Sequence, residues 1–139
     1  MPKGKKIAIT ISAIAVVLLA GLILFYNLLV GNVYFKFGKY DSPNDKYTIV
    51  VKCTDAFMFG PQDIKIKARK NTFWGNFTGK EYVTFIGNDG KNLDENNIII
   101  NWKNDEQAEI ILKGEEQEDE ILIITFGDKI LIEENKCVL

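Results

Sequence analysis

The sequence predicts one N-terminal transmembrane helix followed by an all-β domain, an antiparallel sandwich or meander of about seven to eight short strands. The helix is predicted by Ile7 to Val30, about two dozen residues without a charge. A helix of that length reaches ~36 Å, enough to cross a ~30 Å hydrocarbon core. The β domain is predicted by short runs of alternating or β-branched apolar residues, separated by turn residues, and by the lack of helical periodicity after Val30.

These patterns divide the chain into a basic tail (1–6), a membrane span (7–30) and a β domain (31–139). A cleaved secretory leader is the alternative to a retained anchor. A leader has an apolar core of ~7–15 residues before a small-residue cleavage site. This run is longer, and Gly31-Asn32-Val33 does not form such a site. The sequence therefore favours a single-pass signal anchor.

The orientation of the span follows from the lysines that flank it. Lys3, Lys5 and Lys6 lie directly before the helix, whereas the first five residues after Val30 carry no positive charge. Because cytoplasmic flanks are enriched in Lys and Arg, we expect the N-terminus in the cytoplasm and the domain outside the plasma membrane. The bias is modest, since Lys36, Lys39 and Lys46 follow on the far side.

Charge limits the partners of the domain. All 19 acidic residues lie after the span, with 14 of the 17 basic ones, so this part carries about −5. Nucleic acids and anionic bilayer surfaces require a basic footprint, which this balance does not predict. Residues 34–104 have three more basic than acidic residues, and residues 105–139 have eight more acidic than basic. Either the two halves neutralise each other as neighbouring strands, or the second half forms an acidic docking face.

Several kinds of chemistry are excluded by composition. The chain has no histidine, so Ser-His-Asp and Cys-His nucleophile systems and His-containing zinc sites cannot form. Two cysteines alone cannot make a zinc site. Cys53 and Cys137 either pair as a disulfide outside the cytoplasm or stay reduced, with Cys53 as a small buried apolar residue. We predict no enzymatic activity, no cofactor and no metal.

The strands are expected in order between clear turn signals. Residues 47–53 are rich in β-branched side chains, and residues 64–69 alternate apolar residues with cations, the pattern of a half-solvated antiparallel strand. Tyr34, Phe35 and Phe37 belong to a first strand, to the membrane interface, or to both. The remaining strands are expected at residues 81–86, 98–102, 108–112, 121–126 and 129–132, the last two joined by a two-residue Gly127-Asp128 turn.

The order of segments along the chain is also informative. The chain has a basic tail, a single span, an aromatic juxtamembrane stretch, and the turn Ser42-Pro43-Asn44-Asp45-Lys46-Tyr47 leading into an apolar strand. In this order it resembles small uncharacterised single-span envelope proteins of Firmicutes with an SPNxKY-type turn. The resemblance implies an anchored β domain in the cell envelope and supplies no catalytic residues.

Two stretches are candidate functional sites. Large apolar side chains in loops either fold into the core or mark a contact surface, and the candidates are Phe57, Met58, Phe59, Phe73, Trp74 and Phe77. Acidic residues gather in a second stretch, which is either a solvated loop, a Ca²⁺ ligand set or an acidic docking face. Its members are Glu115, Glu116, Glu118, Asp119 and Glu120.

Two functions of different class fit these features. The first is a non-enzymatic, membrane-anchored module that binds a protein or cell-wall component near the membrane. The second is an envelope immunity or inhibitor-type protein that acts through its acidic C-terminal part. A hydrolase that uses carboxylates alone is a third class, for which the sequence places no two acids in an apolar cleft.

Overall fold

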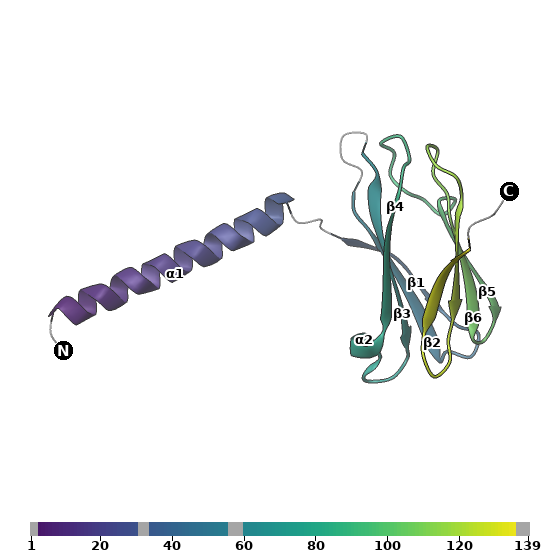
Figure 1. Ribbon diagram of the computed structural model, residues 1–139, viewed down its shortest axis with the longest axis horizontal. Helices are drawn as coiled ribbons and strands as arrows, with labels where there is room; N and C mark the ends of the chain where they lie inside the picture. The colour runs from purple at the N-terminus through teal and green to yellow at the C-terminus, as the bar shows by residue number, and fades with distance from the viewer. Residues whose placement is uncertain (1–2, 31–33, 56–59, 136–139) are drawn as a thin grey trace. The chain divides into compact units, whose positions relative to one another are not determined.

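The computed structural model describes residues 3–30, 34–55 and 60–135. It contains a long helix, α1 (Lys3–Val30), and a separate compact β domain that begins at Tyr34 (Figure 1). The predicted fold class, one N-terminal helix followed by an all-β domain, is confirmed.

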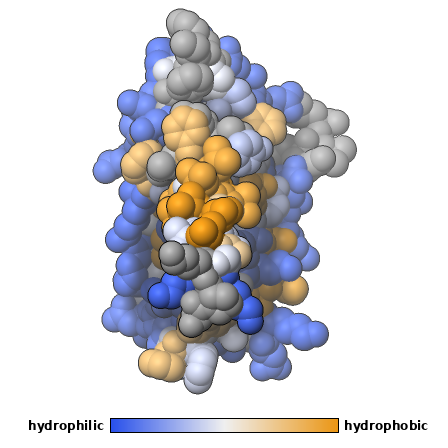
Figure 2. Space-filling view, turned by 90° about the vertical axis from the view of Figure 1, so that its left-hand side faces the viewer, coloured by the Kyte–Doolittle hydropathy of each residue, from blue (hydrophilic) through white to orange (hydrophobic). Residues whose placement is uncertain are grey.

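Helix α1 is apolar on all sides. Its large apolar side chains between Ile7 and Tyr26 are 55–70% exposed, and apolar surface of the helix is seen as orange atoms in Figure 2. The Thr10 hydroxyl donates to the Lys6 carbonyl oxygen at 2.9 Å, so this polar group is satisfied within the helix. By length and composition, the segment Gly4–Tyr26 could cross a membrane, a property that cleaved signal sequences share.

The β domain is a sandwich of two four-stranded antiparallel sheets, each a simple meander. The first sheet has the order β1-β2-β3-β4 and the second has the order β5-β6-β7-β8. A four-residue helix, α2 (Gly75–Thr78), interrupts the connection from β3 to β4. The strands are β1 (Phe35–Asp41), β2 (Tyr47–Cys53), β3 (Gln62–Lys70), β4 (Lys80–Ile86), β5 (Ile98–Asn104), β6 (Gln107–Leu112), β7 (Glu120–Thr125) and β8 (Leu131–Asn135).

The core lies between the two sheets, where every second side chain points inward. In β3, Ile64, Ile66 and Ala68 are fully buried while the lysines between them are partly exposed, as their alternation predicts. The inward residues of both sheets form one cluster. Its other buried members are Tyr47, Ile49, Val51, Ile86, Ile98, Ala108, Ile110, Leu112, Leu122, Ile124 and Phe126.

The two halves of opposite charge meet as neighbouring strands at one place, where β5 of the basic half pairs with β6 of the acidic half, so the expectation of cross-strand neutralisation is met there and not across the other described strands. All strands of the basic half up to β4 pair within the first sheet, and β6, β7 and β8 of the acidic half pair within the second. The reason is topological: each strand pairs with its neighbour in sequence, and no described strand crosses between sheets. The cross-strand ion pair Lys67–Glu81 (3.3 Å) lies within the basic half, whereas Lys103–Glu109 (2.9 Å) joins the two halves inside the second sheet.

The closing hairpin differs from the predicted two-residue turn. Strand β7 ends at Thr125 and β8 begins at Leu131, so the connection includes more than Gly127-Asp128. Phe126 directly follows the last residue of β7 and packs into the core, with its ring 4.6 Å from that of Tyr47 and 5.5 Å from that of Trp102. This stack joins the first sheet to the second.

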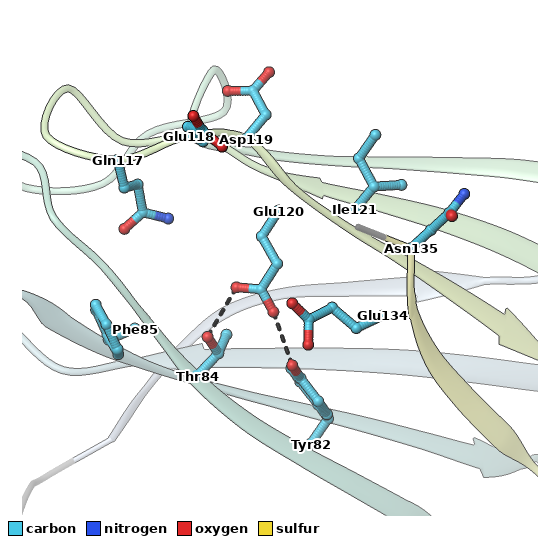
Figure 3. A pocket seen from close by; sticks show the side chains of 10 residues that line it. All are labelled: Tyr82, Thr84, Phe85, Gln117, Glu118, Asp119, Glu120, Ile121, Glu134 and Asn135. Atoms are coloured by element: carbon cyan, nitrogen blue, oxygen red, sulfur yellow. Dashed lines mark hydrogen bonds between the residues drawn. The ribbon is translucent and has the colours of Figure 1, made fainter. Parts of the chain in front are cut away.

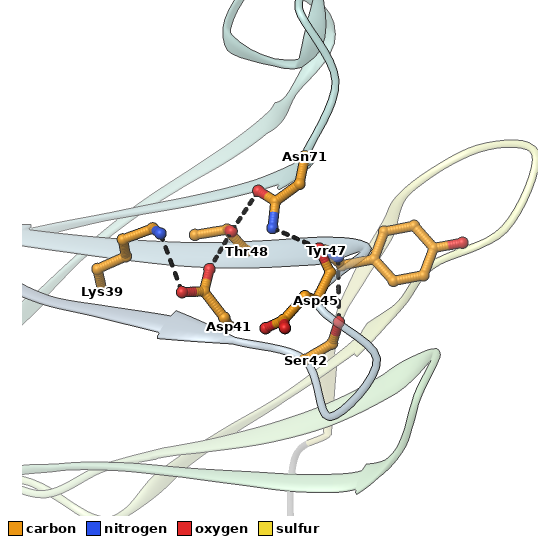
Figure 4. A network of polar contacts seen from close by, with 7 residues as sticks. All are labelled: Lys39, Asp41, Ser42, Asp45, Tyr47, Thr48 and Asn71. Carbon is orange, nitrogen blue, oxygen red and sulfur yellow. Dashed lines mark hydrogen bonds and ion pairs between the residues drawn. The ribbon is translucent and has the colours of Figure 1, made fainter.

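The Ser42–Lys46 turn, part of the SPNxKY-type motif, is held by its own polar groups (Figure 4). The Ser42 hydroxyl oxygen accepts from the Tyr47 N–H at 3.1 Å and donates to Asn44 Oδ1 at 2.8 Å. Asp45 adopts a positive φ of 57°, which Asp tolerates better than most residues. The Asn71 amide donates to the Asp45 carbonyl at 2.8 Å, tying the turn to the end of β3. These residues therefore have a structural role.

A second polar contact flanks this turn. The Thr48 hydroxyl, which is fully buried, donates to the Asp41 carboxylate and also lies against the Asn71 amide oxygen. The hydrogen bond from Thr48, followed by the one from Lys39, lowers the pKa of the Asp41 carboxyl. The carboxylate thus joins β1 to β2 beside the turn.

Two strands are interrupted by irregular pairing. The register of β1 against β2 shifts between Lys36 and Gly38, and that of β5 against β6 shifts between Trp102 and Asn104. Each shift places an extra residue in the bulged strand, which increases its local twist.

Replacing Phe126 with alanine is expected to destabilise the domain by about 3–5 kcal/mol, because it removes a buried ring and leaves a cavity between the sheets. Phe85→Ala is the matched control, since Phe85 is 57% exposed and its loss should change stability by about 0.5 kcal/mol or less. Denaturant unfolding of the full-length chain in detergent micelles measures both. Equal losses would contradict the described core.

Candidate functional site

Three aromatic side chains project from the loop between β3 and β4. Phe73, Trp74 and Phe77 are 84%, 65% and 80% exposed. The Phe73 and Trp74 rings meet edge to face at 5.1 Å, and the Trp74 and Phe77 rings lie 6.1 Å apart. We call these three residues the aromatic ledge. They do not fold into the end of the sandwich, so the structure rules out the core alternative for them.

The ledge is held by close backbone packing. A Cβ on Gly75 would lie 1.8 Å from the Lys70 carbonyl oxygen, so only glycine fits there. Beyond it, the Trp74 carbonyl accepts from the Phe77 N–H at 3.0 Å and from the Thr78 hydroxyl at 3.2 Å, forming one helical turn. The loop thus fixes its rings in an exposed position, which lowers the entropy that a partner must remove on binding.

A shallow basic hollow lies beside the ledge on the outer face of the first sheet. Its volume is about 250 Å³, and Val50, Asn76 and Glu81 line it together with four cations. The cations are Lys52, Lys65, Lys67 and Arg69. From the alternation in β3, the sequence predicted only that the cations of this strand face solvent. The alternation did not indicate that Lys52 joins these cations, because Lys52 lies on a different strand.

The acidic stretch is not a uniform solvated loop. The Glu115 carboxylate forms an ion pair with the Lys91 ammonium group at 2.7 Å. The Asp119 carboxylate lies 3.5 Å from the Lys113 ammonium group. The Glu116 N–H donates to the Gly87 carbonyl at 3.3 Å. Glu118 is exposed, whereas Glu120 is partly buried and turns toward the first sheet. The five residues therefore do not share one face.

Glu120 lies in a cleft of about 550 Å³ between β4 and the second sheet (Figure 3). Its carboxylate accepts from the Tyr82 hydroxyl at 2.8 Å and from the Thr84 hydroxyl at 2.9 Å. Because both of its carboxylate oxygens accept hydrogen bonds from β4, Glu120 of β7 connects the second sheet to the first. Three further acidic residues line the cleft, namely Glu118, Asp119 and Glu134. This acidic cleft suits a cationic ligand.

The titration of Tyr82 is strongly altered by this cleft. Burial, the hydrogen bond to Glu120, and the charges of Glu120 and Glu134 raise the pKa of Tyr82 to about 12.

No group of three or more metal-ligating side chains gathers anywhere in the described part of the chain.

The remaining predicted residues are placed only in part. Cys53 is half-buried on the inward side of β2, and burial, followed by the charge of Asp55, raises the pKa of its thiol. Cys137 lies outside the described residues, as do Phe57, Met58 and Phe59. The disulfide between Cys53 and Cys137 stays a prediction.

Replacing Tyr82 with phenylalanine is expected to reduce the loss of stability in alkali. A folded-state pKa of about 12, above the ordinary value of 10.0, gives stability that is complete below pH 10 and is lost as the pH rises toward 12. The melting temperature of wild type should therefore fall more steeply than that of Tyr82→Phe across this interval, while lysine titration affects both equally. Parallel curves would show that Tyr82 titrates like a solvated tyrosine.

No known protein family, curated protein or solved structure matches this chain.

Proposed function

We propose that this protein is a non-enzymatic, membrane-anchored module whose aromatic ledge contacts a protein or envelope component close to the bilayer. One observation carries the proposal: three large rings stand 65–84% exposed on a closely packed loop. Exposed aromatic clusters of this kind mark interaction sites more often than they mark bare surface. The resemblance to single-span Firmicutes envelope proteins supports the same setting.

The anchor in this proposal is α1, with the N-terminus in the cytoplasm and the domain outside the plasma membrane. The length and exposed apolar surface of α1 support retention in lipid. The lysines before the helix support the orientation.

Replacing Leu18 and Leu22 with aspartate is expected to release the chain from membranes, because each carboxylate near the middle of a span costs about 3 kcal/mol. Leu18→Ala with Leu22→Ala is the matched control and should stay in the pellet after carbonate extraction of cells. Protease added to intact cells should digest the domain. A full-length wild-type chain in the supernatant would overturn the anchor, and a shortened chain would identify α1 as a cleaved leader.

A photocrosslinking amino acid at Phe77 is expected to capture the partner in cells, since this side chain is 80% exposed. The same group at Asp105, an exposed residue between β5 and β6, is the control and should capture nothing. Trp74→Ala should abolish capture at Phe77 without lowering the melting temperature of the domain. A loss of stability of several kcal/mol in Trp74→Ala would instead indicate a core residue.

The acidic cleft favours a second candidate, an envelope immunity or inhibitor-type protein that binds a cationic partner. The four acidic residues that line the cleft support it. Capture by a crosslinker at Glu118 but not at Phe77, lost at high ionic strength because salt screens exposed charges, would favour this candidate over the ledge.

A further inference from the structure

Three lysines form a row across the outer face of the first sheet. Lys36 in β1 pairs in register with Lys52 in β2, and Lys52 pairs with Lys65 in β3. Directly opposite side chains of adjacent strands have Cβ atoms ~5 Å apart, where like charges destabilise the sheet. The fold therefore holds together charges that repel each other, and an anion placed over the row would relieve that repulsion.

The charge of this face is only partly neutralised. Besides the row, Lys39, Lys67 and Arg69 also point outward, against the carboxylates of Asp41, Asp63 and Glu81. Asp41 pairs with Lys39 at 2.9 Å and Glu81 pairs with Lys67 at 3.3 Å. Within the described residues, the row and Arg69 form no ion pair, and the Lys65 ammonium group lies 4.4 Å from the centre of the Tyr34 ring. We call the six cations the basic face.

Exposed apolar side chains border the basic face. Val83 pairs with Lys65 and Phe85 with Asp63, and the two side chains are 55% and 57% exposed. The ledge helix α2 lies on the side of the first sheet that faces away from the second sheet (Figure 1). Asn76 of α2 lines the basic hollow together with Lys52. Cations and large rings are thus presented together.

Such a surface has the chemistry of a bilayer interface. Lys and Arg near an anionic leaflet are attracted by its negative surface potential, and Trp and Phe side chains enter the boundary between headgroups and acyl chains. Four residues separate Val30, the end of α1, from Phe35, the start of β1. A connection of that length spans at most about 18 Å. An anchored domain therefore always remains within reach of headgroups.

We propose that the basic face and the aromatic ledge dock on anionic phospholipid headgroups, with phosphate groups over the Lys36–Lys52–Lys65 row and the ledge rings in the interface. This inference rests on the proposed membrane anchor and names the envelope component that the ledge contacts. The overall negative charge of the domain predicted no such surface. The basic face exists nonetheless, because β1 to β4 form a sheet of their own, which separates the basic face from the acidic strands β6 to β8 of the second sheet.

The test uses the full-length chain reconstituted in vesicles of phosphatidylcholine alone or of phosphatidylcholine mixed with phosphatidylglycerol. Trp102→Phe leaves Trp74 as the single tryptophan, since the chain has two, and brominated lipids quench tryptophans that enter the interface. If Trp102→Phe does not fold, the difference between wild type and Trp74→Phe gives the same signal. Stronger quenching with phosphatidylglycerol, reversed by salt, is expected.

Lys52→Gln with Lys65→Gln should shift the ratio of docked to free domain about 25-fold toward the free form, at about fivefold per lysine. The same double variant should not lower the melting temperature, because it relieves repulsion. Lys103→Gln with Lys129→Gln removes equal charge outside the basic face and should leave quenching unchanged.

The outcomes separate this inference from the anchor. Flotation of the chain with both vesicle types, without a difference in quenching, would overturn lipid docking and leave the anchor intact. Failure to float would overturn both. Stabilisation by soluble polyphosphate through Lys52 and Lys65, with no response to phosphatidylglycerol, would overturn the lipid and assign the row to free phosphate polymers.

Discussion

The shared core of two facing sheets is the constraint on which the rest of the domain depends. Because strand side chains alternate between faces, filling the space between the sheets with Ile49, Ile66, Ile110 and Leu122 commits their sequence neighbours to the outside. The lysines that separate the buried residues of β3 therefore lie on the outer face of the first sheet. The surface chemistry of the domain is therefore a direct result of the way its core is made.

Beside the acidic cleft, polar rather than apolar side chains connect the two sheets. Here Glu120, the first residue of β7, and Tyr82 and Thr84 of β4 are partly buried beside the acidic cleft. A carboxylate in such a place requires donors from the opposite sheet, and the two hydroxyls provide them. These hydrogen bonds connect the two sheets at the border of an otherwise apolar core.

Local patterns in the sequence were enough to predict the strands but not the surfaces. The alternation from Ile64 to Arg69 predicts β3 because a period of two is visible within one segment. The lysine row was not predictable, since Lys52 meets Lys36 and Lys65 only through the register of three strands. The prediction placed Phe126 in a strand that ends one residue earlier, and the packing of its ring against Tyr47 and Trp102 was not predictable because these residues are distant in sequence. The exposure of Trp74 depends on the tight approach at Gly75, which composition does not reveal.

The bulges in β1 and β5 have a consequence for association between copies of the chain. Each of these strands is the outermost of its sheet, so one side of its backbone presents unsatisfied N–H and C=O groups that could recruit another chain. The membrane anchor proposed above would raise the frequency of such encounters, because it would confine the copies to two dimensions. The irregular spacing at Phe37 and Lys103 interrupts the continuous ladder that polymerisation by strand addition requires. Strand addition is thereby opposed at these two edges, while β4 and β8 form the other edge of each sheet.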